Sequence, residues 1–185
     1  KAGNSKTKYT AHALARGEIV GWFQGKMEYG PRALGNRSIL ASAIDNSINK
    51  KLNDRLNREE FMPFAPVTLF EYAHEVYVDW KPEHLSSYFM TKTYNVTPSF
   101  RDLCPAVVHI DGTARPQIIK ENQNKEYHNV IQEYFKITGV HTIINTSFNH
   151  HEEPIVCNPE DALNSLLIGN VDVLIVENFI VKMKN

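Results

Sequence analysis

Apolar runs that alternate with helical patterns dominate the chain. The first two runs with the β-branched and aromatic content of buried strands are "EIVGWFQG" (18–25) and "RSILAS" (37–42), which enclose a glycine-rich loop. Further runs of the same character are "PVTLF" (66–70), "SSYFMTKTY" (86–94), "AVVHI" (106–110), "RPQIIK" (115–120), "HTIINTS" (141–147), "DVLIVE" (172–177) and "FIVKM" (179–183). Each of these runs predicts a strand.

Helical patterns lie between the runs, over residues 6–16, 45–56, 125–136 and 159–168. Gly17 is a typical residue after a helix end, and Asp45 is the predicted N-cap of the second helix. The apolar residues of that helix recur every four positions, at Ile44, Ile48, Leu52 and Leu56. Asn158 is the predicted cap of the last helix, with Pro159 at its first position. The pattern as a whole predicts an α/β (α+β) domain, in which helices pack on a mixed sheet.

Composition limits the kind of protein. The 185 residues, 42% hydrophobic and 22% charged, suffice for one core, so residues 1–185 are predicted to be a single domain. A net charge of -1 argues against broad attraction to nucleic acid or acidic membranes. Cys104 and Cys157 have no CxxC spacing, which favours a reducing compartment and hence the cytoplasm. The start lacks both an initiator Met and a signal-peptide pattern, so we expect a part of a longer polypeptide without a membrane segment.

The loop "EYGPRALGNRS" (28–38) carries two arginines, Arg32 and Arg37, five residues apart. Gly30 and Gly35 permit positive φ and close backbone approach, while Pro31 fixes the turn between them. Guanidinium groups mounted on such a loop present a rigid fork of donors, which is the form of an anion site. The alternative is a loop whose arginines pair with surface carboxylates.

The following helix places Lys51, Arg55 and Arg58 at i, i+4 and i+7, so they are predicted to share one face. A solvated helix face is the alternative. Phe61 and Phe64, which follow that helix, offer a stacking surface suited to a purine base and are equally suited to the core.

Two later segments place polar residues at predicted strand ends, where ligands commonly bind in α/β sheets. "HIDGTARPQ" contains Asp111, Thr113 and Arg115, and Asp111 is a candidate ligand for Mg²⁺. "INTSFNHHEEP" contains Asn145, Ser147 and Asn149, which can bind an amide or a phosphate oxygen. Ordinary Asx turns are the alternative in both segments.

Four blocks, "GKMEYGPRALGNRSIL", "NDRLNREEFMPFAPV", "HIDGTARPQ" and "INTSFNHHEEPIV", resemble the signature segments of the C-terminal domain of the carbamoyltransferase family (NodU/CmcH type). Their order and spacing match over nearly the whole chain. The resemblance implies a YrdC-like fold, related to domains that make carbamoyl- and threonylcarbamoyl-adenylates. It also implies a preceding actin-like transferase domain, absent from this chain, that holds a transition metal and selects the acceptor hydroxyl of an antibiotic, sugar or signalling oligosaccharide.

The implied reaction uses carbamoyl phosphate, ATP and Mg²⁺ to form carbamoyl-adenylate and pyrophosphate. The implied roles place Arg32 and Arg37 at phosphates beside Ser38. Lys51, Arg58 and Arg115 complete the cationic pocket. The remaining candidates for nucleotide and carbamoyl binding are Arg55, Phe64, Thr113, Asn145, Ser147 and Asn149.

Departures from the family pattern are mild at Lys26 and Tyr29, where relatives usually have Arg and Phe. Glu152 stands where the family usually has Gly, so we expect the turn after Asn149 to differ, and a site role for Glu153 is weakly supported. The "HHEE" segment (150–153) lacks HExxH spacing, which argues against zinc.

Two other functions stay open: a tRNA-binding YrdC-like module, against which the balanced charge argues, and a regulatory domain without catalysis.

Overall fold

A computed structural model of the protein describes residues 5–58 and 63–184. The helices are α1 (Ser5–Ala15), α2 (Ser47–Leu56), α3 (Ala73–Val76), α4 (Pro98–Leu103), α5 (Lys125–Thr138) and α6 (Pro159–Leu167). The strands are β1 (Val20–Phe23), β2 (Arg37–Ser42), β3 (Ala65–Leu69), β4 (Tyr94–Asn95), β5 (Thr113–Ala114), β6 (Gln117–Ile119), β7 (Thr142–Ser147), β8 (Val173–Val176) and β9 (Phe179–Val181). Short turns of 3₁₀ helix lie at Phe70–Tyr72, Leu85–Tyr88 and Pro105–Val107.

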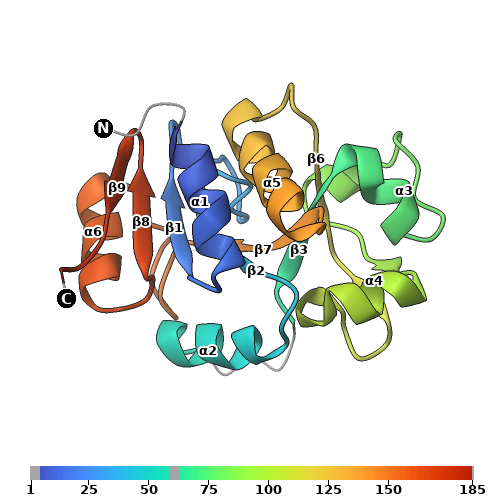
Figure 1. Ribbon diagram of the computed structural model, residues 1–185, viewed down its shortest axis with the longest axis horizontal. Helices are drawn as coiled ribbons and strands as arrows, with labels where there is room; N and C mark the ends of the chain where they lie inside the picture. Colours follow the sequence, from blue (N-terminus) through green and yellow to red (C-terminus); the bar gives the residue numbers. More distant parts are fainter. Residues whose placement is uncertain (1–4, 59–62, 185) are drawn as a thin grey trace.

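Seven of these strands form one mixed sheet in the order β6-β3-β7-β2-β1-β8-β9 (Figure 1). The pairs β1/β8 and β3/β6 are parallel, and the other neighbours are antiparallel. Strands β4 and β5 form a separate two-stranded pair. This arrangement confirms the predicted α/β class with a mixed sheet and packed helices.

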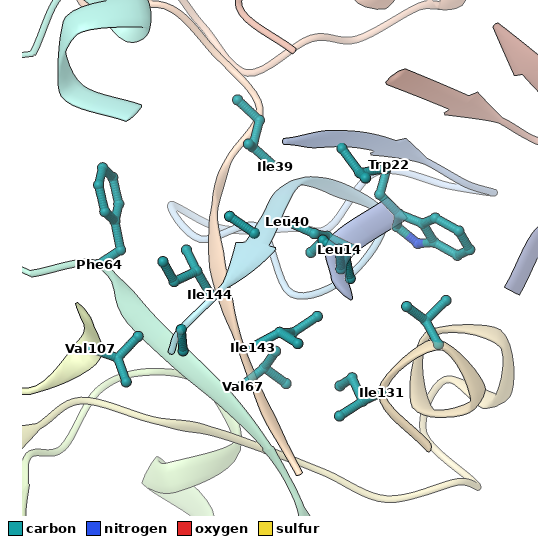
Figure 2. Close-up of a cluster of buried hydrophobic side chains, with 14 of the residues drawn as sticks. Leu14, Trp22, Ile39, Leu40, Phe64, Val67, Val107, Ile131, Ile143 and Ile144 are labelled. Carbon is teal, nitrogen blue, oxygen red and sulfur yellow. The ribbon is translucent and has the colours of Figure 1, made fainter. Parts of the chain in front are cut away.

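Helices α1 and α5 lie side by side across the sheet (Figure 1), and the main core lies beneath them. Leu14 of α1 and Ile131 of α5 are fully buried together with Trp22, Leu40 and Ile143 of the strands (Figure 2). Burial of each such side chain contributes about 1.5–3 kcal/mol. No helix in the described part of the chain combines the length and the apolar character needed to cross a membrane.

The predicted cap of α6 is confirmed. Asn158 accepts a hydrogen bond from the Asp161 N–H at 2.9 Å, and the Asp161 carboxylate accepts from the Asn158 N–H at 3.2 Å. This reciprocal capping box satisfies two N–H groups that would otherwise lack partners, and it orients α6 against β1 and β8. The cap of α2 differs by one residue from the prediction: Asn46 is the N-cap, while the Asp45 carboxylate accepts from the Ser47 N–H at 2.9 Å.

Two predicted strands are wrong. Residues 86–94 begin within the 3₁₀ turn Leu85–Tyr88, and Met90 has a φ of 55°, which an extended strand cannot contain. Residues 106–110 begin inside the turn Pro105–Val107, whose first position is a proline. Both runs still bury Tyr88, Ala106 and Val107 in the core. Their apolar content therefore reports burial and not strand geometry.

Candidate functional site

The sheet topology brings the four sequence blocks to one edge. Ser38 at the start of β2 pairs with Ser147 at the end of β7, and Ala65 at the start of β3 pairs with Asn145. Strand β6 runs parallel to β3 and therefore starts at the same edge. The loop before β2, the segments before β3 and β6, and the turn after β7 consequently meet there.

A pocket of about 250 Å³ opens at this edge. The predicted site residues that line it are Arg32, Arg58, Phe64, Arg115, Asn145, Ser147 and Asn149. The lining also includes Met90, Thr146, His151 and Glu152, to which the sequence assigned no site role. Three guanidinium groups and several amides or hydroxyls thus converge on one small cavity, an arrangement that suits a polyanion with further hydrogen-bonding groups.

Two buried amide side chains attach the arginine loop to the sheet. Asn145 Nδ2 donates to the Ala33 carbonyl at 3.1 Å and to Gln117 Oε1 at 2.7 Å. Gln117 Nε2 donates to the Leu34 carbonyl at 2.8 Å. Asn145 lines the pocket. Its Oδ1 atom is buried and accepts no hydrogen bond from the described residues. Such a buried acceptor is suited to an N–H group of a ligand, because an unmatched buried polar atom is costly. The role of Gln117 could not be recognised in a run that only predicts a strand.

The base of the loop is held by Arg37 and Glu28. The Arg37 guanidinium donates to the carbonyls of Gln24, Gly25 and Asn36 at 2.8–2.9 Å and lies 3.5 Å from the centre of the Phe23 ring. Only 4% of Arg37 is exposed, and the burial lowers its pKa. Arg37 is not among the residues that line the pocket. The family resemblance implied that it would contact phosphates.

Glu28 and Ser38 also bind the loop backbone. Glu28 Oε1 accepts from the N–H groups of Leu34 and Asn36, both at 2.7 Å. Ser38 is fully buried, and its Oγ accepts from the Gly35 N–H at 3.1 Å. Ser38 therefore contacts the loop and does not line the pocket. Glu28 was not predicted, since an acidic residue in a loop carries no signal of this role.

Gly35 is required by the packing of the loop. Its φ is 113°, and a Cβ atom at this position would overlap the buried ring of Tyr127 in α5. The indole Nε1 of Trp22 donates to the Gly35 carbonyl at 2.9 Å. The loop is thus clamped between β1 and α5.

Arg58 reaches the pocket because α2 ends before it. Asn57 adopts the left-handed conformation with a φ of 51°, and the chain turns away from the helix axis. Arg58 then donates to Thr146 Oγ1 and Asn149 Oδ1, both at 2.9 Å. The prediction that Arg58 continues the helical face of Lys51 and Arg55 is therefore wrong.

Lys51 and Arg55 lie on α2 outside the pocket lining. Arg55 Nη1 is 2.8 Å from Asp172 Oδ1, and Lys51 Nζ is 3.7 Å from Asp172 Oδ2. Partial burial alone raises the pKa of Asp172, but the Ile19 N–H and the Arg55 guanidinium outweigh it and hold that pKa below 3.8. The two cations thus link α2 to the start of β8.

Asp111 and Thr113 form an Asx turn that also lies outside the pocket lining. Asp111 Oδ1 accepts from the Thr113 hydroxyl at 2.8 Å and from its N–H at 2.9 Å, and these bonds lower the pKa of Asp111. Nowhere in residues 5–58 or 63–184 do three or more His, Cys, Asp or Glu side chains gather as metal ligands.

Phe64 lines the pocket and is 6% exposed, so it serves the core as well, whereas Phe61 lies outside the described residues.

The turn after β7 shows why glycine would suit position 152. Glu152 has a φ of 63°, in the left-handed region that glycine adopts without strain, and it lies in the pocket lining. The backbone carbonyl of the next residue, Glu153, accepts from Asn149 Nδ2 at 2.9 Å, and its side chain is exposed outside this pocket.

Comparison with known proteins identifies relatives over almost the whole chain. Nodulation protein NolNO of Sinorhizobium fredii is 41% identical over 176 residues, which make up 94% of this chain and 26% of the relative. An uncharacterised protein of Methanocaldococcus jannaschii, MJ1058, is 40% identical over 184 residues, 98% of this chain and 29% of the relative. The chain thus spans between a quarter and a third of the length of these relatives.

The solved structure of full-length HypF in its phosphate- and nucleotide-bound form superposes with a TM-score of 0.64 at 21% sequence identity. The match covers 94% of this chain and 25% of HypF, and it confirms the predicted YrdC-like fold. The family model described as carbamoyltransferase C-terminus matches residues 11–183. The protein therefore belongs to the family of carbamoyltransferase C-terminal domains.

Proposed function

We propose that the pocket converts carbamoyl phosphate and ATP into carbamoyl-adenylate, which a separate transferase domain uses to carbamoylate an acceptor hydroxyl. The observation that carries this proposal is the convergence of Arg32, Arg58 and Arg115 on one polar pocket. The chain as a whole has a net charge of -1, so this positive charge is a local feature. HypF, whose fold is similar, was solved with phosphate and nucleotide bound, which supports the same use of this fold.

The chemistry requires two bond exchanges. Water first cleaves carbamoyl phosphate into carbamate and inorganic phosphate. A carbamate oxygen then attacks the α-phosphorus of ATP; the new O–P bond forms as the bond to the β-phosphate oxygen breaks, and pyrophosphate leaves with the electron pair. The attacking group belongs to the substrate, so no side chain has to act as a nucleophile.

The pocket residues supply binding and charge stabilisation for these steps. Arginine forks bind phosphate oxygens in a planar, bidentate manner, and fixed cations stabilise the charge that develops on the leaving pyrophosphate. Asn145 Oδ1, buried and without a partner among the described residues, is positioned to accept from the carbamoyl NH₂ group. Ser147 and Asn149 line the same strand end. The Ser147 hydroxyl donates to Asn149 Oδ1 at 2.6 Å, and Asn149 Nδ2 donates to the His150 and Glu153 carbonyls, so these two residues shape the pocket wall.

Magnesium would neutralise part of the phosphate charge when it binds together with the nucleotide. The described pocket lining includes one carboxylate, that of Glu152, so the residues present fit a hard cation that is bound mainly by substrate oxygens. Asp111 is engaged in its own turn outside this lining.

Exchange of labelled pyrophosphate into ATP tests the proposal directly. We expect exchange in the presence of Mg²⁺ that depends on carbamoyl phosphate, and a loss of about a hundredfold or more in Arg32→Ala, because one well-placed charged donor is removed. Lys125→Ala is the matched control, since Lys125 is exposed and pairs with Glu121 on the surface at 3.3 Å.

Other results point to the other functions. ATP binding without exchange would mean that chemistry needs the transferase domain. A lack of both would contradict the proposal and favour a regulatory domain, whereas salt-dependent binding of tRNA would favour the nucleic-acid module.

A further inference from the structure

Glu152 combines an unusual backbone with an unusual position. Its φ of 63° is one that glycine adopts freely and that other residues adopt at a cost. The turn around it is fixed, because His151 N–H donates to the Leu56 carbonyl at 2.9 Å and Glu153 N–H donates to the His150 carbonyl at 3.2 Å. Strain that is maintained by surrounding hydrogen bonds is characteristic of functional sites.

The side chain of Glu152 introduces a negative charge into a pocket suited to anions. It lines the same cavity as Arg32, Arg58 and Arg115. Yet within the described residues no lysine, arginine or histidine forms an ion pair with its carboxylate. Glu152 is exposed, so its side chain is accessible to a ligand and to solvent. A bare polyphosphate in this pocket would be repelled by Glu152 while it is attracted by the arginines.

A divalent cation removes this conflict. Magnesium binds proteins through one or two carboxylates together with substrate phosphate oxygens, and it keeps several of its water ligands. A carboxylate at the pocket lining, without a cationic partner among the described side chains, can supply such a ligand directly or through water. The same carboxylate that opposes metal-free nucleotide then favours its magnesium complex.

We propose that Glu152 binds the divalent cation of the nucleotide, so that this pocket discriminates the magnesium complex of ATP from metal-free ATP. The inference rests on the proposed function, because it assumes that a nucleotide occupies the pocket. It assigns the metal contact to the turn after β7 and makes Glu152 a determinant of specificity.

The test is calorimetric titration of the chain with ATP, once with excess MgCl₂ and once with EDTA. The quantity of interest is the ratio of the Kd for metal-free ATP to the Kd for the magnesium complex. We expect Glu152→Gln to reduce this ratio by about tenfold, since one unit charge next to the ligand is removed. Two opposite shifts should produce the reduction: metal-free ATP binds more tightly and the magnesium complex binds more weakly.

Two further variants separate charge from backbone. Glu152→Gly removes the charge and also relieves the left-handed strain, and we expect it to reduce the ratio as much as Glu152→Gln does. Glu153→Gln removes an equal charge one residue further along, outside the pocket lining, and should leave the ratio unchanged.

The outcomes are distinct. An unchanged ratio in Glu152→Gln, with ATP still bound, overturns the metal contact and leaves the proposed function intact. An equal reduction in Glu153→Gln also overturns it, because the effect would then be one of general charge. Failure of the unmodified chain to bind ATP under either condition overturns this inference together with the proposed function.

Discussion

The tip and the base of the loop at residues 28–38 each carry one arginine, and the two arginines differ in burial and in what their guanidinium groups contact. Arg32 at the tip is partly exposed and lines the pocket. Arg37 at the base is buried, and its guanidinium donates to three backbone carbonyls and stacks on Phe23. The comparison shows that the loop needs positive charge for two purposes, ligand binding at the tip and backbone support at the base.

The two arginines differ in which acceptors their guanidinium N–H groups bond. Backbone carbonyls accept from both terminal nitrogens of Arg37, whereas its buried Nε has no partner among the described residues. The side chain is thus bonded to the loop backbone and lies outside the pocket lining. This base, together with Glu28 and Ser38, holds the backbone of residues 34–36, which supports the tip. Such preorganisation reduces the entropy lost on binding.

The largest expected effect is at Gly35, between tip and base. In Gly35→Ala, the methyl group would overlap Tyr127 and the backbone would be held at a φ of 113°. We expect a loss of about 4 kcal/mol in the free energy of unfolding, measured by urea denaturation. Gly30→Ala is the matched control, since its φ is 131° and, beyond its chain neighbours, no atom of the described residues lies within 4 Å of the added methyl group. A similar loss in both variants would show that packing on α5 does not fix the loop.

The next effect separates the two arginines. Arg37→Met leaves the carbonyls of Gln24 and Gly25 without their partner, and we expect a loss of about 3 kcal/mol in unfolding free energy. Arg32→Met should change this quantity by no more than about 0.5 kcal/mol, because Arg32 is partly exposed and supports no comparable network in the described residues. Urea denaturation of both variants gives the answer. Equal losses would mean that tip and base are one structural unit.

The smallest effect concerns the cations that do not enter the pocket. Asp172→Asn removes the charge that pairs with Lys51 and Arg55, and we expect a loss of about 1 kcal/mol at neutral pH, because the pair is partly screened by solvent. The folded-state pKa of Asp172 is lowered, so its stabilisation is present above the ordinary value of 3.8 and disappears as the pH falls through the folded-state value.

Urea denaturation between pH 7 and about pH 3 should therefore show the difference between Asp172→Asn and the unmodified chain becoming smaller towards acid. A difference that stays constant over this range would show that the Asp172 charge does not stabilise the fold.

The sequence was sufficient for elements with strong local signals. Strand β2 has the predicted bounds, and the Asn158 cap of α6 is as expected, because apolar runs and capping residues act over a few neighbouring positions. The strand predicted at residues 106–110 failed because an apolar run has the same composition in a buried 3₁₀ turn. Burial is visible in such a run, whereas backbone geometry is decided by distant contacts.

The candidate site was predictable as a set of blocks and less so as individual residues. Arg32, Arg58 and Arg115 lie together because β2, β3 and β6 start where β7 ends, and this register is a long-range property of the sheet. Arg37 could not be distinguished from Arg32, since both are arginines of one glycine-rich loop. The contacts of Arg37 with the Phe23 ring and with the carbonyls of Gln24 and Gly25, which follow β1, separate the two arginines only in the folded protein.

The hydrogen bond from Trp22 to the Gly35 carbonyl also has an optical consequence. The chain has two tryptophans. The other, Trp80, is distant from the arginine loop in the sequence and donates its indole N–H to Ser87. In a Trp80→Phe background, the emission of the remaining indole reports on the backbone of the arginine loop itself. The domain thus contains an intrinsic fluorophore at the support of its pocket, through which movements of the loop can be followed in solution without a label.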